Sequence, residues 1–211
     1  MRSLAFLAVM ATGLLTAGLV HAGGLEDKNL GEAALKLEDF HRAIDHFTKA
    51  IQSGELSDAD TATTLNLRGL AHYSNIPPDR STGNSQQIRR HFDHAIADFS
   101  QAVRLVPEYA EALNNRGQAY HQGPYYTHYV NQSRRAAEDF QTAAKLGHAA
   151  AQFTLGWYYE KGWGDLPQDR QQAAKWYRKS AIQGHSNAQY NLGVFLTAGS
   201  FVRRNFTESA Q

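Results

Sequence analysis

The chain of 211 residues contains no cysteine, so its fold has no disulfide bonds. It has five prolines, and its 21 basic residues nearly balance its 20 acidic residues. A surface with such balanced charge provides no long-range attraction for nucleic acid or anionic lipid. No apolar run long enough to span a membrane follows the first 22 residues. We therefore expect no nucleic-acid partner and no membrane-spanning segment in the mature chain.

The first 22 residues, MRSLAFLAVMATGLLTAGLVHA, have the composition of an export signal. Arg2 precedes an uncharged apolar stretch, and Val20 and Ala22 place small residues at positions −3 and −1 of a cleavage site. This pattern predicts cleavage after Ala22 and export of the mature chain. We expect the bacterial periplasm as its compartment, with the extracellular space and the lumen of the endoplasmic reticulum as alternatives.

Two segments of ten residues nearly repeat each other. GHAAAQFTLG begins at Gly147, and GHSNAQYNLG begins at Gly184, 37 residues later. Self-similarity at a fixed period of this size is typical of an array of stacked helix pairs, in which each pair buries its apolar face against its neighbours. The repeat therefore predicts the fold class more directly than any single motif does.

A small–aromatic–small pattern at i, i+4 and i+7 recurs along the chain and places three residues on one helix face. The aromatic members are Phe47, Phe99, Phe140 and Tyr177. The helix that precedes this pattern in each unit carries a glycine, and these glycines are Gly31, Gly69, Gly117, Gly156 and Gly193. Because glycine inside a helix costs about 1 kcal/mol relative to alanine, we expect these positions to be sites of close contact between helices.

The register predicts an all-α chain of four helix pairs and the beginning of a fifth. The expected first helices are 25–37, 58–74, 108–121, 149–161 and 186–198. The expected second helices are 40–52, 88–104, 133–145 and 169–182. Two pairs carry insertions between their helices, within 75–87 and 122–132, which are polar or turn-rich. Loops on a rigid scaffold often carry function.

These glycine and small–aromatic–small patterns resemble those of two families of helical repeats. Residues Ala95, Phe99, Ala102, Pro107 and Gly117 match the signature of the tetratricopeptide repeat (TPR). The Sel-one-like repeat (SLR) is matched by Leu155, Gly156, Tyr159, Gly162, Gly164, Ala173, Trp176, Tyr177, Ala181, Gly184, Ala188, Gln189, Tyr190, Leu192 and Gly193. The resemblance implies a right-handed α-solenoid of antiparallel helix pairs. It divides the chain into a signal peptide (1–22), TPR-like repeats with two insertions (23–146), a Sel-one-like region (147–199) and a short tail (200–211).

In TPR arrays the first helices line a concave groove that holds a protein or peptide. By resemblance, the ligand positions fall on Lys28, Glu32, Asn66, Leu70, Tyr73, Asn114, Gln118 and His121. Lys28 fits a clamp for a carboxylate, but Glu32 and Glu111 oppose an acidic ligand, so we expect no such clamp. The expected partner-binding residues are Asn66, Tyr73, Asn114, Gln118 and His121, together with Tyr125, Tyr126 and Tyr129 of the second insertion. Tyrosines suit binding surfaces, although their rings can equally seal the loop against the next repeat.

No nucleophile, phosphate-binding or zinc-protease motif is present, so we expect no enzyme activity and no cofactor. His91 and His94 have the i, i+3 spacing of metal ligands, but no third ligand has a defined spacing to them, and we expect no metal site. His148 and His185 occupy equivalent repeat positions, which favours an architectural role. The alternative function is an envelope hydrolase or a glycan-binding protein that uses the Tyr-rich loop 120–130.

The sequence is therefore interpreted as an exported scaffold or adaptor that binds a partner protein or peptide. A homodimer is a further expectation. The expected helix 186–198 is a first helix, and only about a dozen residues follow it, too few for a complete second helix. We expect Phe195, Leu196 and Phe201 to form an exposed apolar strip that associates with a partner or with a second copy of the chain. The alternative is a tail that folds back and covers the strip through Phe201 and Phe206.

Overall fold

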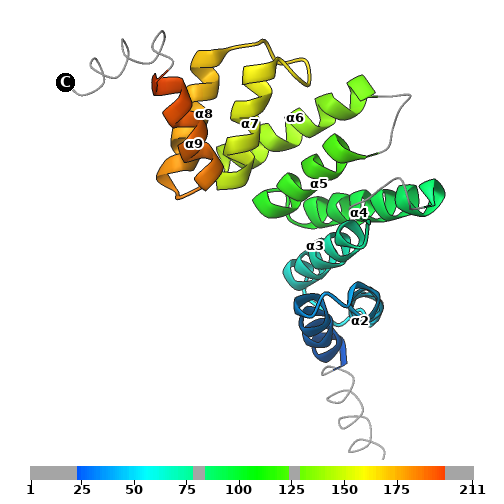
Figure 1. The fold of residues 1–211 in the computed structure, drawn as a ribbon. Helices are drawn as coiled ribbons and strands as arrows, with labels where there is room; N and C mark the ends of the chain where they lie inside the picture. Colours follow the sequence, from blue (N-terminus) through cyan, green and yellow to red (C-terminus); the bar gives the residue numbers. More distant parts are fainter. Residues whose placement is uncertain (1–22, 78–83, 124–128, 198–211) are drawn as a thin grey trace, which may run out of the picture. The chain divides into compact units, whose positions relative to one another are not determined.

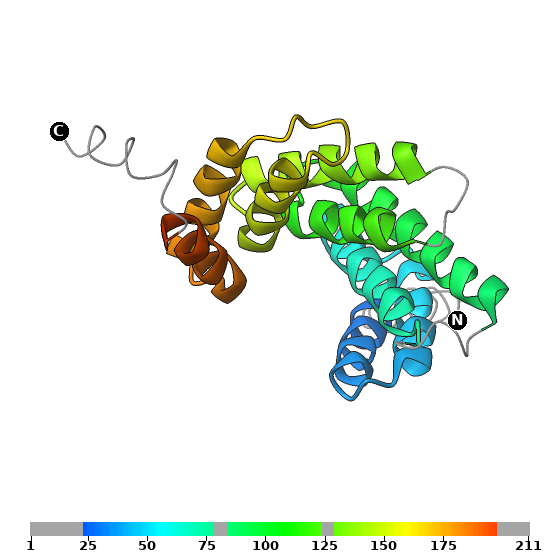
Figure 2. The ribbon, with the colours of Figure 1, turned by 45° about the horizontal axis from the view of Figure 1, so that its top comes forward.

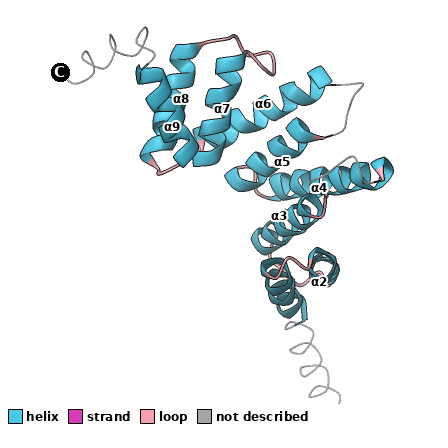
Figure 3. Cartoon of the chain, viewed as in Figure 1, coloured by secondary structure: helices cyan, strands magenta, loops and turns pink. Residues whose placement is uncertain are grey.

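The computed structural model describes residues 23–77, 84–123 and 129–197, and in these ranges it contains helices, turns and loops but no strand (Figure 3). A first helix spans residues 23–36. It is followed by α2 (Phe40–Gln52), α3 (Asp58–Ser74), α4 (Ser85–Leu105), α5 (Ala110–Gln122), α6 (Tyr129–Lys145), α7 (Ala149–Lys161), α8 (Arg170–Ile182) and α9 (Ser186–Thr197). The all-α class predicted from the repeat register is confirmed.

Two helices begin three or four residues earlier than the sequence analysis expected. Helix α4 begins at Ser85 rather than 88, and α6 begins at Tyr129 rather than 133. Asn84 explains the first difference, because its side chain accepts a hydrogen bond from the backbone N–H of Gln86 and so caps the helix. In the second case no glycine or proline separates Tyr129 from the predicted start. Tyr129 therefore belongs to a helix and not to the loop to which we assigned it.

The chain forms two compact units, one ending at Pro107 and the other beginning at Glu108. In the first unit, α3 packs against both α2 and α4. In the second unit each of the helices α5 to α9 packs against the next one along the chain (Figures 1 and 2). Neighbours in sequence are thus neighbours in space within each unit, as expected for repeats that bury their apolar faces pairwise.

Four of the predicted glycines lie directly against the predicted aromatic rings. A Cβ added to Gly31 would lie 2.6 Å from the ring of Phe47, and one added to Gly69 would lie 2.7 Å from the ring of Phe99. The same distance is 2.8 Å for Gly117 against Phe140 and for Gly156 against Tyr177. All four rings are buried. The close contact between helices that we predicted is confirmed at these four positions. At Gly193, in α9, an added Cβ would have no described atom within 4 Å, so the prediction of close contact there was wrong for the described residues.

Side-chain caps fix where several helices begin. Ser57 accepts a hydrogen bond from the backbone N–H of Asp60 at the start of α3, and Asp169 accepts two at the start of α8. His148 accepts one from the N–H of Ala151, at 3.2 Å, and His185 accepts the equivalent one from Ala188 at 3.4 Å. Both histidines therefore cap helices at equivalent repeat positions, and the architectural role predicted for them is confirmed.

The end of α9 is less exposed than the apolar strip that the sequence analysis expected there. Phe195 is half-buried, and its ring packs edge-on against Tyr177 with 5.6 Å between ring centroids. Leu196 is 44 % exposed as expected, and Tyr190 is 73 % exposed. The expectation for Phe195 was wrong because Tyr177, which lies against Gly156, also packs against the Phe195 ring of α9. Phe201 and Phe206 lie outside the described residues, and the homodimer stays a prediction.

None of the described helices combines the length and the apolar composition that crossing a membrane requires. The predicted signal segment, residues 1–22, lies outside the described residues.

Candidate partner-binding surfaces

The two predicted amide residues lie inside their helix pairs. Asn66 of α3 is fully buried, and Asn114 of α5 is 7 % exposed. Asn114 donates a long hydrogen bond of 3.4 Å to the side chain of Asn115, while its buried Oδ1 accepts none from the described residues. Burial keeps both amides away from an approaching partner. The predicted contact of Asn66 and Asn114 with a partner therefore gains no support from the structure.

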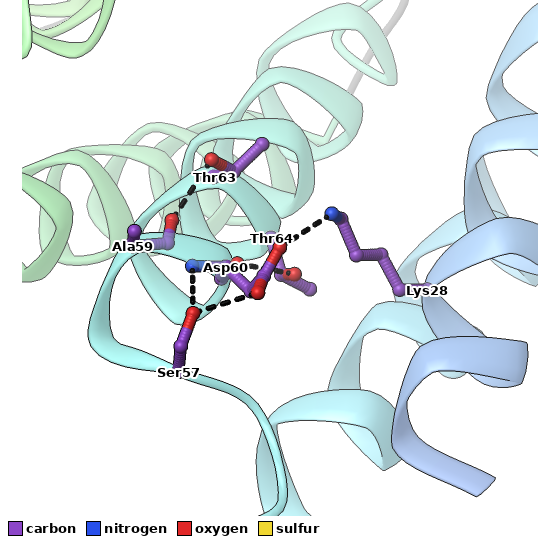
Figure 4. Close-up of polar contacts among 6 residues, drawn as sticks. All are labelled: Lys28, Ser57, Ala59, Asp60, Thr63 and Thr64. Atoms are coloured by element: carbon purple, nitrogen blue, oxygen red, sulfur yellow. Dashed lines mark hydrogen bonds and ion pairs between the residues drawn. The ribbon is translucent and has the colours of Figure 1, made fainter. Parts of the chain in front are cut away.

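Lys28, a groove position by resemblance, is engaged within the first unit (Figure 4). Its ammonium group lies 3.0 Å from Oδ1 of Asp60, and the hydroxyl of Ser57 donates to Oδ2 of the same carboxylate at 2.6 Å. The Ser57 hydrogen bond and then Lys28 lower the pKa of Asp60. The lysine thus joins the first helix to α3, which supports our expectation that no carboxylate clamp is present.

Tyr73 of α3 is half-buried, and its ring packs edge-on against Phe92 of α4 with 5.8 Å between centroids. Gln118 of α5 is also half-buried, and its side-chain oxygen accepts a hydrogen bond from Gln122 at 3.5 Å. Tyr125 and Tyr126 lie outside the described residues, and the side chain of Tyr129 does as well. The partner contacts predicted for these five residues stay predictions.

His121 belongs to a set of four rings, which we call the aromatic cluster and which consists of His121, Trp157, Tyr158 and Trp163. The His121 ring centroid lies 5.5 Å from each tryptophan and 5.6 Å from Tyr158. The Tyr158 hydroxyl hydrogen-bonds the Nδ1 of His121 at 2.9 Å. Tyr158 is buried at the base of the cluster, and the other three rings are half-buried. The cluster therefore reaches the surface of the second unit while resting on its core.

Burial lowers the pKa of His121, so the imidazole is neutral at pH 7. The cluster combines this neutral ring with two indoles, each of which offers a large apolar face and one N–H donor. The ring planes of Trp157 and Trp163 are inclined at 67° to each other, with centroids 4.5 Å apart. Such a surface suits an apolar or weakly polar ligand group, and its four rings provide no positive charge to attract a phosphate or a carboxylate.

The short segment between α7 and α8 holds Trp163 in place. Gly162 and Gly164 on either side have φ values of +70° and +64°, in the left-handed region that glycine tolerates without strain. A Cβ on Gly164 would lie 2.6 Å from the carbonyl oxygen of Ser133 in α6, so the segment approaches α6 very closely. Asp165 forms an ion pair with Arg134 of α6. Trp163 is thus positioned by the backbone on both sides of it.

The sequence analysis missed both tryptophans of the cluster. Trp157 follows the repeat glycine Gly156 directly, and Trp163 stands between the two glycines of the Sel-one-like motif. Their proximity to His121 depends on how α5 and α7 pack, which the repeat register alone does not specify. The spacing of 37 residues between His121 and Tyr158, equal to the repeat period, was the one available signal.

Two buried arginine–aspartate pairs were also missed. Arg68 of α3 donates two hydrogen bonds to Asp98 of α4, at 2.6 and 2.8 Å. Arg116 of α5 donates two to Asp139 of α6, at 2.7 and 2.8 Å. Each arginine directly precedes a repeat glycine, and each aspartate directly precedes a repeat aromatic residue. The sequences NLRG in α3 and DF in α4 therefore correspond to NNRG in α5 and DF in α6. These residues join the two helices of a pair, and their role is structural.

Histidines in the first unit gather without forming a metal site. His72 of α3 stacks on His94 at 4.9 Å and lies 5.9 Å from His91. The ring planes of His72 and His94 are only 24° apart, and since ring-nitrogen lone pairs lie in those planes, the two rings do not aim at one ion between them. Across the described part of the chain, no three His, Asp or Glu side chains form a group that suits a metal ion.

Comparison with known proteins identifies helical repeats along the chain. The Sel1 repeat model matches residues 29–55, 110–148, 149–185 and 186–211, and a TPR repeat model matches 91–123. The first Sel1 matches lie well before residue 147, where the sequence analysis began its Sel-one-like region. The comparison with curated proteins found no match.

Two solved structures have similar folds. The crystal structure of MamA has a TM-score of 0.54 and 19 % identity, over 85 % of this chain and 87 % of that one. The crystal structure of a Sel1 repeat protein from Oxalobacter formigenes also has a TM-score of 0.54, with 20 % identity over 80 % of this chain and 59 % of that one. At such low identity the likeness shows the fold alone, which is that of helical-repeat proteins.

Proposed function

The chain belongs to the Sel1 repeat family, and from this premise we propose that it is an exported, non-enzymatic scaffold that binds a partner protein or peptide. Helical-repeat scaffolds of this kind generally serve protein interaction. The observation that carries the proposal is the aromatic cluster, in which His121, Trp157 and Trp163 reach the surface while resting on buried Tyr158.

The position and chemistry of the cluster both support a role in binding. His121 lies on α5 and Trp157 on α7, which are first helices of their pairs, and by family resemblance first helices face the ligand. Tryptophan is enriched among the residues that dominate binding energy, because its large rigid ring buries much area at a small cost in entropy. The neutral cluster favours an apolar anchor of the partner, flanked by groups that accept hydrogen bonds from the indoles.

Site-specific photo-crosslinking in the native host tests this proposal. A photoreactive residue at Gln118, on the same helix as His121, should capture a discrete partner. The same residue at Ile182, which is 79 % exposed at the end of α8, serves as the control position and should capture none. Trp163→Ala should remove the adduct at Gln118 without changing the helical circular dichroism. Equal adducts at both positions, or an adduct that Trp163→Ala leaves intact, would contradict binding at the cluster.

Export is the second part of the proposal, and the composition of residues 1–22 supports it. We expect the mature chain to begin at Gly23 and to be released with the periplasmic fraction. N-terminal sequencing of protein purified from fractionated cells of the host checks both points. A chain that keeps Met1, or one recovered with the cytoplasm, would contradict export but would leave the binding proposal standing.

A further inference from the structure

Three histidine side chains meet in the first unit, and we call His72, His91 and His94 the histidine cluster. His72 is the third residue from the end of α3, and the other two belong to the first half of α4. The cluster therefore lies at the end of the α3–α4 pair that residues 75–84 connect. The ring of His72 contacts both of the others, at 4.9 Å from His94 and 5.9 Å from His91.

The surroundings of His72 and His91 favour the neutral imidazole. The Nδ1 atoms of His72 and His91 are buried, and no described residue forms a hydrogen bond with either of them. The main charge effects on these two rings come from positive groups, which are Arg68 of α3, Arg90 of α4 and His41 of α2, in addition to the other members of the cluster.

Two carboxylates of α4 lie near the cluster in sequence, and neither is among the main causes of the lowered pKa of His72 or His91. Asp98 is buried and accepts both of its hydrogen bonds from Arg68. Asp93 stands between His91 and His94 in sequence, and its side chain is exposed to solvent. The main causes that lower the pKa of His72 and of His91 are burial and positive neighbours. A proton on either ring is therefore opposed by burial and by these positive neighbours.

The direction of the effect on stability follows from the pKa values. Burial, and then the positive neighbours, lower the pKa of His72 from 6.5 to about 4, and burial likewise lowers that of His91. Both groups bind protons more tightly when the helix pair is open. The stability of the closed pair is therefore complete above pH 6.5 and falls as the pH decreases toward 4.

We propose that the histidine cluster makes the α3–α4 pair an acid-sensitive element, which opens at the end that carries the cluster when the pH falls below about 6. Opening separates α3 from α4 where Tyr73 packs against Phe92. It exposes these two rings and changes the face on which Tyr73 lies. The element depends on the helix pair alone and needs no bound partner.

Hydrogen exchange of the full mature chain at pH 8 and pH 5 tests this proposal. After correction for the chemical effect of pH on exchange, peptides of α3 and α4 should open more often at pH 5. The shift of His72 alone corresponds to an increase of about 30-fold in the opening equilibrium, so we expect at least about tenfold. Peptides of α8, which contains no histidine, provide the internal reference.

Two variants separate the cluster from a general effect of acid. His72→Phe keeps a ring against His94 but carries no charge, and it should reduce the acid effect on α3 and α4 to a few-fold. His185→Asn removes a histidine from the second unit while keeping a capping oxygen, and it should behave like the wild type in α3 and α4. If His72→Phe does not fold at pH 8, the exposed His94→Gln replaces it and should reduce the acid effect several-fold.

Three results would overturn the proposal. The first is equal corrected exchange of α3 and α4 at pH 8 and pH 5 in the wild type. The second is an acid effect of undiminished size in His72→Phe, or in His94→Gln where that variant replaces it. The third is an equal loss of protection in α8, because it would show that acid opens the whole chain rather than this helix pair.

Discussion

Replacing Phe140 with alanine is expected to lower the free energy of unfolding of the second unit by about 3–5 kcal/mol. The ring is fully buried between α5 and α6 and packs edge-on against Tyr158 at 5.3 Å. It also fills the space left by the missing side chain of Gly117. Urea denaturation followed by tryptophan fluorescence reports on this unit, because all three tryptophans lie in it. Leu146→Ala, at a partly exposed position after α6, should cost less than about 1 kcal/mol.

A double-mutant cycle with Gly117→Ala tests the contact itself. In the wild type, a Cβ on Gly117 would lie 2.8 Å from the Phe140 ring, so the substitution should destabilise. In the Phe140→Ala background the obstacle is gone, and the higher helix propensity of alanine should stabilise by up to about 1 kcal/mol. The sign of the Gly117→Ala effect should therefore reverse. The same sign in both backgrounds would contradict the glycine–aromatic packing.

Replacing Arg116 with methionine should have an effect of similar size, about 3–5 kcal/mol, because it leaves the buried carboxylate of Asp139 without its partner. The Asp139 hydrogen bond raises the pKa of Arg116, and burial raises the pKa of Asp139 even with the arginine present. Without the arginine, the interactions that oppose the effect of burial are lost, and the pKa of Asp139 should rise further. The deficit should therefore shrink as the pH falls toward 4, where the carboxyl group takes up a proton.

Urea denaturation of three variants at pH 7 and pH 4.5 checks this prediction. Arg116→Met with Asp139→Leu replaces both charges by apolar groups and should recover most of the lost stability. Arg134→Met breaks the exposed Arg134–Asp165 pair and should cost less than about 1 kcal/mol. If Arg116→Met costs no more than Arg134→Met, or if its deficit is independent of pH, the buried pair does not stabilise the helix pair in this way.

The fold was predictable from the sequence because its determinants recur at a fixed period. The repeat glycines cost helix propensity, and only close packing explains their regular placement. The structure places Gly31, Gly69, Gly117 and Gly156 against the four predicted rings. The helix ends were predictable where a capping residue stands at the boundary, as Asp169 does before α8.

The candidate site was less predictable because it depends on contacts between helices. The resemblance placed His121 correctly on a first helix, but its contacts with Trp157 and Trp163 depend on the packing of α5 with α7 and on the backbone of residues 162–165. Asn66 illustrates the opposite error. Its place in the repeat matches a ligand position of the family, yet the structure buries it. A repeat register specifies which face a residue occupies, and neighbouring side chains decide whether that face is open.

The affinity of the purified mature chain for the partner captured at Gln118 tests the central claim most directly. The account predicts that Trp157→Ala and Trp163→Ala each weaken binding at least about tenfold, or about 1.4 kcal/mol, while Ile182→Ala leaves the dissociation constant unchanged. Isothermal titration calorimetry at pH 7.5, with helix content checked by circular dichroism, measures all three. Unchanged affinity in both folded tryptophan variants would contradict the claim that this scaffold binds its partner through the aromatic cluster.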